Sequence, residues 1–85
     1  MEEKKFKVII VEDVKLELKG TEEIFRHEIP NAEVIGTAMT EQEFWPLIEA
    51  GVPDLVLLDL GLGGSTTIGV DICRNIFKRY PGVHV

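Results

Sequence analysis

Three acidic residues stand directly after apolar runs in this sequence. Glu12 and Asp13 follow "FKVIIV", and Asp59 follows the apolar part of "PDLVLL". If these runs form neighbouring strands of one sheet, their ends bring three carboxylates together. Carboxylates gathered in this way repel one another and raise one another's pKa values, and a cation among them relieves the repulsion. Mg²⁺ prefers such oxygen ligands, so the three acids are candidate magnesium ligands. The alternative is that each acid caps a following helix or faces solvent.

A carboxylate next to Mg²⁺ can also act as a nucleophile toward phosphorus. The product is an aspartyl-phosphate, and the cation neutralises charge on the transferred oxygens. Asp59 is the best candidate nucleophile because it stands at the end of a predicted strand and is followed by a turn. Gly61 can turn its backbone carbonyl toward the metal at little steric cost. In this arrangement Asp13 is a direct ligand and Glu12 is a ligand through water.

The stretch "DLGLGGSTTIG" raises a rival interpretation, a nucleotide-binding α/β domain that uses the Gly61–Ser65 loop. Dinucleotide-binding loops of the form G-x-G-x-x-G follow the first strand of their domain. Here Gly61 and Gly63 begin such a pattern, but Thr66 stands at the third glycine position and the stretch follows the third apolar run. The neighbouring carboxylates would also repel a phosphate that no cation bridges. The residues therefore favour a cation-assisted site over a phosphate cradle.

The elements that must position these residues alternate between two periodicities. Continuous apolar runs of strand length are typical of strands buried on both faces. The helical spacing of Leu18, Thr21, Ile24 and Phe25 predicts a helix from Val14 to about Glu28. The predicted strands span residues 6–11, 32–38 and 53–59, with the start of a fourth at "VHV".

Two further helices are expected. Thr40 and Glu43 form a capping-box pattern, and Gly51 is a C-cap candidate. Because Pro46 is best accommodated in a first helical turn, the regular helix is expected to begin near Trp45. The third helix ends at Pro81, and its apolar face is predicted to comprise Val70, Cys73, Ile76, Phe77 and Tyr80.

Strands that alternate with helices predict an α/β fold with a parallel sheet and right-handed crossovers. In such sheets, binding sites lie at the carboxyl ends of the strands. Glu12, Asp13 and Asp59 all occupy such positions. The order of elements therefore agrees with the proposed chemistry.

Composition restricts the classes of function. The chain has 85 residues, a net charge of −6 and 45% hydrophobic residues, which fits one globular domain or part of one. The acidic balance argues against nucleic-acid binding by this segment. A single cysteine, Cys73, rules out an intrachain disulfide and favours a reducing compartment. With no apolar run of membrane-spanning length and no signal-peptide pattern, a cytoplasmic location away from membranes is expected.

The chain resembles the response regulator receiver domains of two-component signalling. The segments "VIIVED", "PDLVLLDLGL" and "GVDICRNIFKRYPGVHV" are similar to the family's first strand with its acid pair, its third strand with the phospho-acceptor, and its third helix. The resemblance implies a flavodoxin-like α/β fold and phosphorylation of Asp59 by a histidine kinase or phosphotransfer protein. It also implies Mg²⁺ held by Glu12, Asp13, Asp59 and the Gly61 carbonyl. Such a domain is a phosphorylatable switch rather than a turnover enzyme.

The sequence departs from the family pattern in two places that bear on function. The family usually has proline where Gly63 stands, and its helix-opening glycine comes earlier than Gly69, so the loop 63–69 is lengthened. Residues 1–85 are expected to form about the N-terminal two-thirds of a receiver domain, without strand five and helices four and five. The switch Thr or Ser and the Lys that contacts the phosphoryl group are not present in this chain.

Two expectations follow from these departures. The first is an alternative function, namely a receiver-like interaction module that does not signal through phosphate because the switch Thr or Ser and the Lys are absent. The second is self-association of the chain through the open apolar edge of the third strand.

Overall fold

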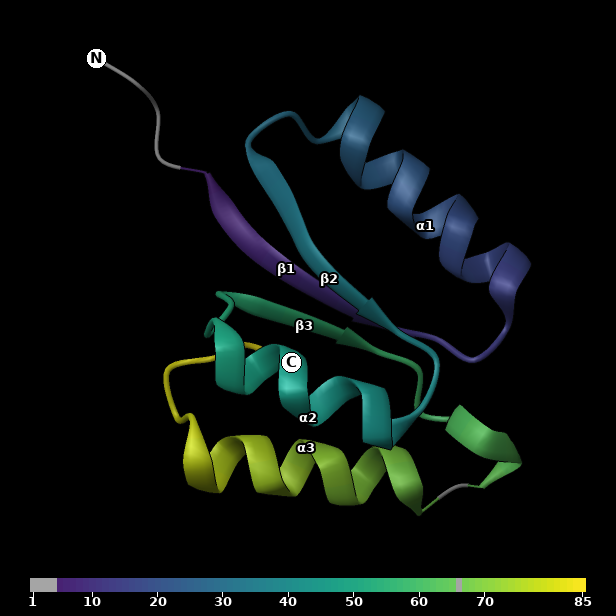
Figure 1. The fold of residues 1–85 in the computed structure, drawn as a ribbon, viewed down its shortest axis with the longest axis vertical. Helices are drawn as coiled ribbons and strands as arrows, with labels where there is room; N and C mark the ends of the chain where they lie inside the picture. The colour runs from purple at the N-terminus through teal and green to yellow at the C-terminus, as the bar shows by residue number, and fades with distance from the viewer. Residues whose placement is uncertain (1–4, 66) are drawn as a thin grey trace.

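The computed structural model describes residues 5–65 and 67–85, so Thr66, which interrupts the glycine pattern, lies outside the described residues. Helices cover both faces of a parallel sheet in a three-layer arrangement (Figure 1), with α1 on one face and α2 and α3 on the other. The elements are β1 (Phe6–Val11), α1 (Lys15–Glu28), β2 (Ala32–Ala38), α2 (Glu41–Ala50), β3 (Leu55–Leu58), a short 3₁₀ turn (Leu62–Gly64) and α3 (Ile68–Arg79).

The sheet has the strand order β2-β1-β3, and β1 is parallel to both neighbours. After β1 the chain forms β2 on one side of β1, and it then crosses back to form β3 on the other side of β1. This reversal makes the carboxyl ends of β1 and β3 adjacent, which is where open α/β sheets place their sites. Pairing of the first and third strands, on which the site prediction depends, is confirmed.

The buried β1 strand supplies both layers of the core. Ile9 and Val11 belong to the cluster under α2 and α3, whereas Val8 and Ile10 belong to the cluster under α1. All four side chains are at most 1% exposed. Alternate residues of a strand point to opposite faces, so a strand covered on both sides must be apolar throughout.

The structure corrects the predicted start of α2. The helix begins at Glu41, and Pro46 lies inside it. The capping box forms, since Thr40 Oγ1 accepts from the Glu43 N–H at 3.2 Å and Glu43 Oε1 accepts from the Met39 N–H at 2.9 Å. Capping at one end and burial of Phe44 at 0% exposure offset the hydrogen bond that the proline removes.

The predicted apolar faces of α1 and α3 were partly wrong. Leu18 and Phe25 of α1 are buried, but Ile24 is 51% exposed, about 100° around the helix from Phe25. On α3 the predicted Ile76 is buried, but so is Ile72, which the prediction omitted, while other predicted members are turned outward. The exposed fraction is 39% for Val70 and 57% for Phe77, and Cys73 is half-buried.

The outer edge of β3 is paired near its start. Leu55 forms a parallel bridge with His84, and the Val56 N–H donates to the His84 carbonyl at 2.8 Å. This agrees with the predicted start of a fourth strand at "VHV". No helix in the described part of the chain has the length and apolar character needed to cross a bilayer.

Candidate functional site

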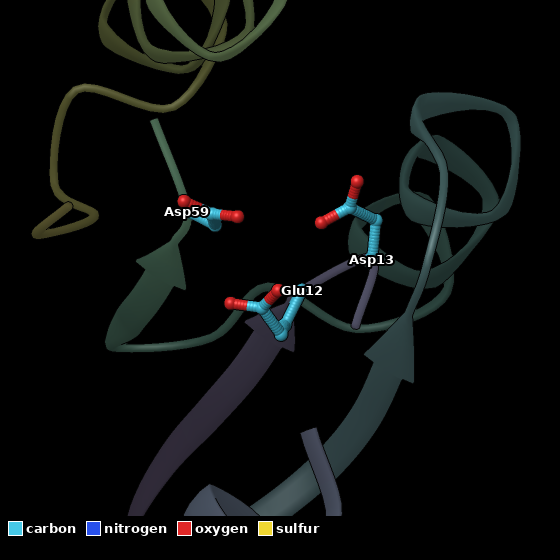
Figure 2. A group of neighbouring side chains, drawn as sticks. All are labelled: Glu12, Asp13 and Asp59. Atoms are coloured by element: carbon cyan, nitrogen blue, oxygen red, sulfur yellow. The ribbon is translucent and has the colours of Figure 1, made fainter. Parts of the chain in front are cut away.

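The three acids converge at the carboxyl ends of β1 and β3. Val11 pairs with Leu58, so the next residues of each strand, Glu12 and Asp59, continue side by side. One ligand oxygen from each of Glu12, Asp13 and Asp59 lies within 4.8 Å of the others. Figure 2 shows the three carboxylates around a shared space beyond the strand ends. The sequence-predicted cluster is therefore present.

Each of the three carboxylates accepts a backbone N–H. Glu12 Oε1 accepts from Val14 at 3.0 Å, and Asp59 Oδ1 accepts from Gly61 at 2.9 Å. Asp13 Oδ2 accepts from Gly63, also at 3.0 Å. Hydrogen bonds to a carboxylate favour its charged form, so the backbone partly compensates for the repulsion among the acids. None of these three backbone donors was predicted from the sequence, which indicated only the Gly61 carbonyl.

At Glu12 the fold disfavours the charged carboxylate, through burial first and through neighbouring charges second. Partial burial raises the pKa of this carboxyl above its ordinary value of 4.5, and the charges of Asp59 and Glu17 raise it further, while the Val14 N–H acts in the opposite direction. The charged form of Glu12 is thus disfavoured in the fold. A cation placed among the three oxygens would remove this disadvantage.

Replacing Glu12 by glutamine is expected to stabilise the fold when Mg²⁺ is chelated. Because the folded state holds the Glu12 proton more tightly than the unfolded chain, its contribution to stability falls as pH rises from 4.5 through the raised pKa. The neutral amide removes that loss and can still accept the Val14 N–H. We expect the free energy of unfolding to increase by about 1 kcal/mol at pH 7, which is the size of one like-charge contact near water.

Urea unfolding in EDTA at pH 7 and at pH 4 measures this effect. The gain should shrink at pH 4, where Glu12 is largely protonated in both states. Glu33→Gln is the matched control, because it removes the same charge from an exposed position near the other end of the sheet. An equal gain in the control, or no gain for Glu12→Gln, would contradict the repulsion argument.

Gly61 lies beside the acids but its carbonyl is already engaged. The Gly61 oxygen accepts from the Gly64 N–H at 3.0 Å, which closes the 3₁₀ turn. A carbonyl oxygen has a second lone pair, so the predicted role as a metal ligand stays a prediction. The amides of Gly61, Gly63 and Gly64 all donate to groups of the chain itself. They are not collected into a nest for phosphate, which disfavours the nucleotide-loop alternative.

A close approach of α3 fixes the segment that carries Asp59. A Cβ added at Gly69 would lie 3.0 Å from the Leu60 Cα and 3.1 Å from the Asp59 carbonyl oxygen. These atoms are backbone and cannot rotate away. Glycine at this position therefore lets the first turn of α3 pack directly on the end of β3. The sequence suggested that Gly69 opens the helix, whereas α3 begins at Ile68 and buries Gly69.

The donor set fits a magnesium ion. Mg²⁺ binds oxygen ligands at about 2.0–2.1 Å, so oxygens on opposite sides of the ion lie about 4.2 Å apart. The observed spread, within 4.8 Å, needs only small side-chain movements to reach that geometry. A site with few protein ligands and open access to water also suits an ion that keeps several waters.

Comparisons with known proteins agree with this geometry. The family model described as "Response regulator receiver domain" matches residues 8–85. The chain is similar to the crystal structure of the response regulator PhyR from Brucella abortus, with a TM-score of 0.79 and 30% sequence identity. The match covers 95% of this chain and 32% of the PhyR chain, so the chain spans about a third of that protein's length. A search of the curated proteins gave no match.

The predicted flavodoxin-like α/β fold is confirmed by the parallel sheet and by the structural match over nearly the whole chain. The resemblance drawn from the sequence segments is confirmed by the family match. The chain belongs to the response regulator receiver domain family.

Proposed function

We propose that this chain is a phospho-acceptor domain, which takes a phosphoryl group onto Asp59 with the help of Mg²⁺. The observation that carries the proposal is the convergence of Glu12, Asp13 and Asp59 at adjacent strand ends in a member of the receiver family. The domain would act as a signalling switch and not as a turnover enzyme. A phosphorylated histidine on a kinase or phosphotransfer protein is the proposed donor.

In the proposed reaction an Asp59 carboxylate oxygen attacks the phosphorus atom of the donor. A new P–O bond forms while the P–N bond to the donor imidazole breaks. The departing nitrogen keeps the electron pair, and a proton already on the other ring nitrogen lets the imidazole leave neutral. The Gly61 N–H, which donates to Asp59 Oδ1, helps to orient the carboxylate so that its other oxygen can attack.

Asp13 and Asp59 are the residues that would hold Mg²⁺ directly, with Glu12 bound through water and the Gly61 carbonyl as a further ligand. When bound, the ion would supply positive charge to the phosphoryl oxygens in the transition state. Without it, the three carboxylates would repel the incoming phosphoryl group. The chain's own acids therefore make phosphorylation dependent on the cation.

Intact-mass measurement tests the proposal. The protein is incubated with acetyl phosphate and Mg²⁺, and a matched sample receives EDTA in place of the cation. We expect a mass increase of one phosphoryl group in the first sample alone. A folded protein that gains no such mass, and whose spectra do not respond to Mg²⁺ or to beryllofluoride, would overturn the proposal.

Asp13→Ala is expected to weaken Mg²⁺ binding by about tenfold or more, because even outer partners of metal ligands cost that much when removed. Titration of Mg²⁺ against Trp45 fluorescence measures the affinity, since this tryptophan is the only one in the sequence. Asp71→Ala is the control, because Asp71 is an exposed acid on α3 outside the cluster. Unchanged affinity in Asp13→Ala would contradict the ligand set.

Two further predictions belong with this proposal. A cytoplasmic location is supported by the single cysteine and by the expected phosphotransfer partner. Self-association through β3 is supported by the place of this strand at the edge of the sheet, where among the described residues only Leu55 forms a bridge on the outer side. The alternative of an interaction module independent of phosphate is less favoured, because the three acids lie within reach of one cation, although each also accepts a backbone N–H.

A further inference from the structure

One hydrogen bond links the turn after β3 to the end of β1. The Gly63 N–H donates to Asp13 Oδ2 at 3.0 Å, and the two residues are fifty positions apart in the chain. Gly63 has a φ angle of 68°, in the left-handed region that favours glycine. The backbone at Gly63 is thus set so that its amide points back toward the acid cluster.

This bond restricts how the Asp13 carboxylate can rotate. A carboxylate offers about four lone-pair sites on two oxygens, so one amide contact leaves capacity for a cation. Figure 2 shows one Asp13 oxygen directed toward the space shared with Asp59, whereas the other points upward in this view. With Oδ2 held by Gly63, the side chain loses less rotational freedom when it binds an ion.

We propose that Gly63 is a positioning residue for the cation site, and that its backbone N–H preorganises the Asp13 carboxylate for Mg²⁺. This inference rests on the proposed function of the acid cluster. It also makes the 3₁₀ turn Leu62–Gly64 sensitive to the cation, because a bond that Asp13 makes to Mg²⁺ weakens or shifts the bond that it accepts from Gly63.

The 3₁₀ turn is packed against the hydrophobic core. Leu62 is 2% exposed and belongs to the core cluster that contains Phe44. Gly63 and Trp45 both line a surface hollow of about 420 Å³ between the start of α2 and the turn. A change at Asp13 that displaces this turn is therefore expected to alter the surroundings of Trp45. The fluorescence of Trp45 can then report cation binding.

The direct test is an amide-to-ester exchange at Gly63 in the synthetic chain, which replaces the N–H by an oxygen atom and keeps the φ of 68° that proline cannot adopt. We expect the Mg²⁺ dissociation constant, measured by Trp45 fluorescence, to rise about tenfold, the lower end of the range for outer partners of metal ligands, because the site is exposed. Gly64→Ala is the control for strain in the turn. Gly64 has a φ of 72° and no neighbouring atom within 4 Å of an added Cβ, and this variant keeps the Gly63 N–H. Its dissociation constant should stay within about twofold of the wild-type value.

Amide NMR spectra of the folded wild-type protein test the same contact without altering the turn. The Gly63 N–H signal should move during the Mg²⁺ titration with the dissociation constant that Trp45 reports. It should also move in Asp13→Ala without any cation, because the acceptor is gone, while circular dichroism shows that the fold is retained.

The outcomes separate the two proposals. If wild-type protein binds Mg²⁺ but the Gly63 ester variant binds it equally well, or if the Gly63 signal of the wild-type protein does not move, the positioning role is wrong and the proposed function stands. If wild-type protein does not bind Mg²⁺ at all, the proposed function fails and this inference fails with it. Equal weakening in Gly64→Ala would assign the effect to the shape of the turn and overturn the role of the N–H.

Discussion

Asp59→Asn is expected to abolish the phosphorylated species formed with acetyl phosphate and Mg²⁺. The amide oxygen can still accept the Gly61 N–H that Asp59 Oδ1 accepts at 2.9 Å, so the local turn should persist. What the variant loses is the nucleophile, since a neutral amide does not attack phosphorus at a useful rate. Intact-mass spectra should therefore show no phosphoryl adduct in a protein whose stability is at least that of the wild type.

Asp71→Asn is the matched control, because it makes the same chemical change at an exposed acid on α3. It should form the adduct to the wild-type extent. Peptide mapping of the wild-type adduct should place the phosphoryl group in the segment that contains Asp59. An adduct of normal yield in Asp59→Asn would show that another residue is the acceptor and would contradict the proposed reaction.

Phe44→Ala is expected to produce the largest loss of stability. The Phe44 side chain is 0% exposed, lies in the core cluster with Ile9 and Val11, and meets Trp45 in an edge-to-face contact with 4.9 Å between ring centres. Truncation of a buried phenylalanine costs about 3–5 kcal/mol. A domain of this size has a free energy of unfolding of roughly 4–13 kcal/mol, so much of the sample could unfold at ordinary temperature.

Phe77→Ala provides the matched comparison. The same change is made on α3 at a side chain that is 57% exposed, and the cost should stay within about 0.5 kcal/mol. Urea unfolding followed by circular dichroism measures both variants. Equal losses would mean that Phe77 is as buried as Phe44 and would contradict the orientation of α3 in this structure.

The sequence was sufficient for the alternation of elements and for the position of the acids. Runs such as "FKVIIV" are typical of strands that are covered on both faces in a parallel sheet, and this pattern predicted β1 with its observed bounds, Phe6–Val11. Once the strands are parallel, residues that directly follow them lie at one edge. Glu12, Asp13 and Asp59 could therefore be grouped from the sequence on the assumption that the first and third strands are neighbours, which the structure shows them to be.

Helix interiors were less predictable, and Pro46 shows why. Local propensity places a proline in the first turn of a helix, but α2 begins five residues earlier, at Glu41. The capping box and the buried Phe44 act over the whole helix, and together they outweigh one missing hydrogen bond. The sequence contained both signals, but their relative energies depend on how deeply Phe44 is buried.

The sequence by itself determined that this chain forms a parallel α/β fold with three acids at strand ends, because the periodicity and the alternation of strands and helices are properties of the chain alone. Only the tertiary structure decided which side of α3 is buried and which amide reaches Asp13. Gly69 allows α3 to approach the end of β3, which buries Ile72 and leaves Phe77 outside. The Gly63–Asp13 bond joins residues fifty positions apart, and no local pattern encodes the direction of a single N–H across that separation.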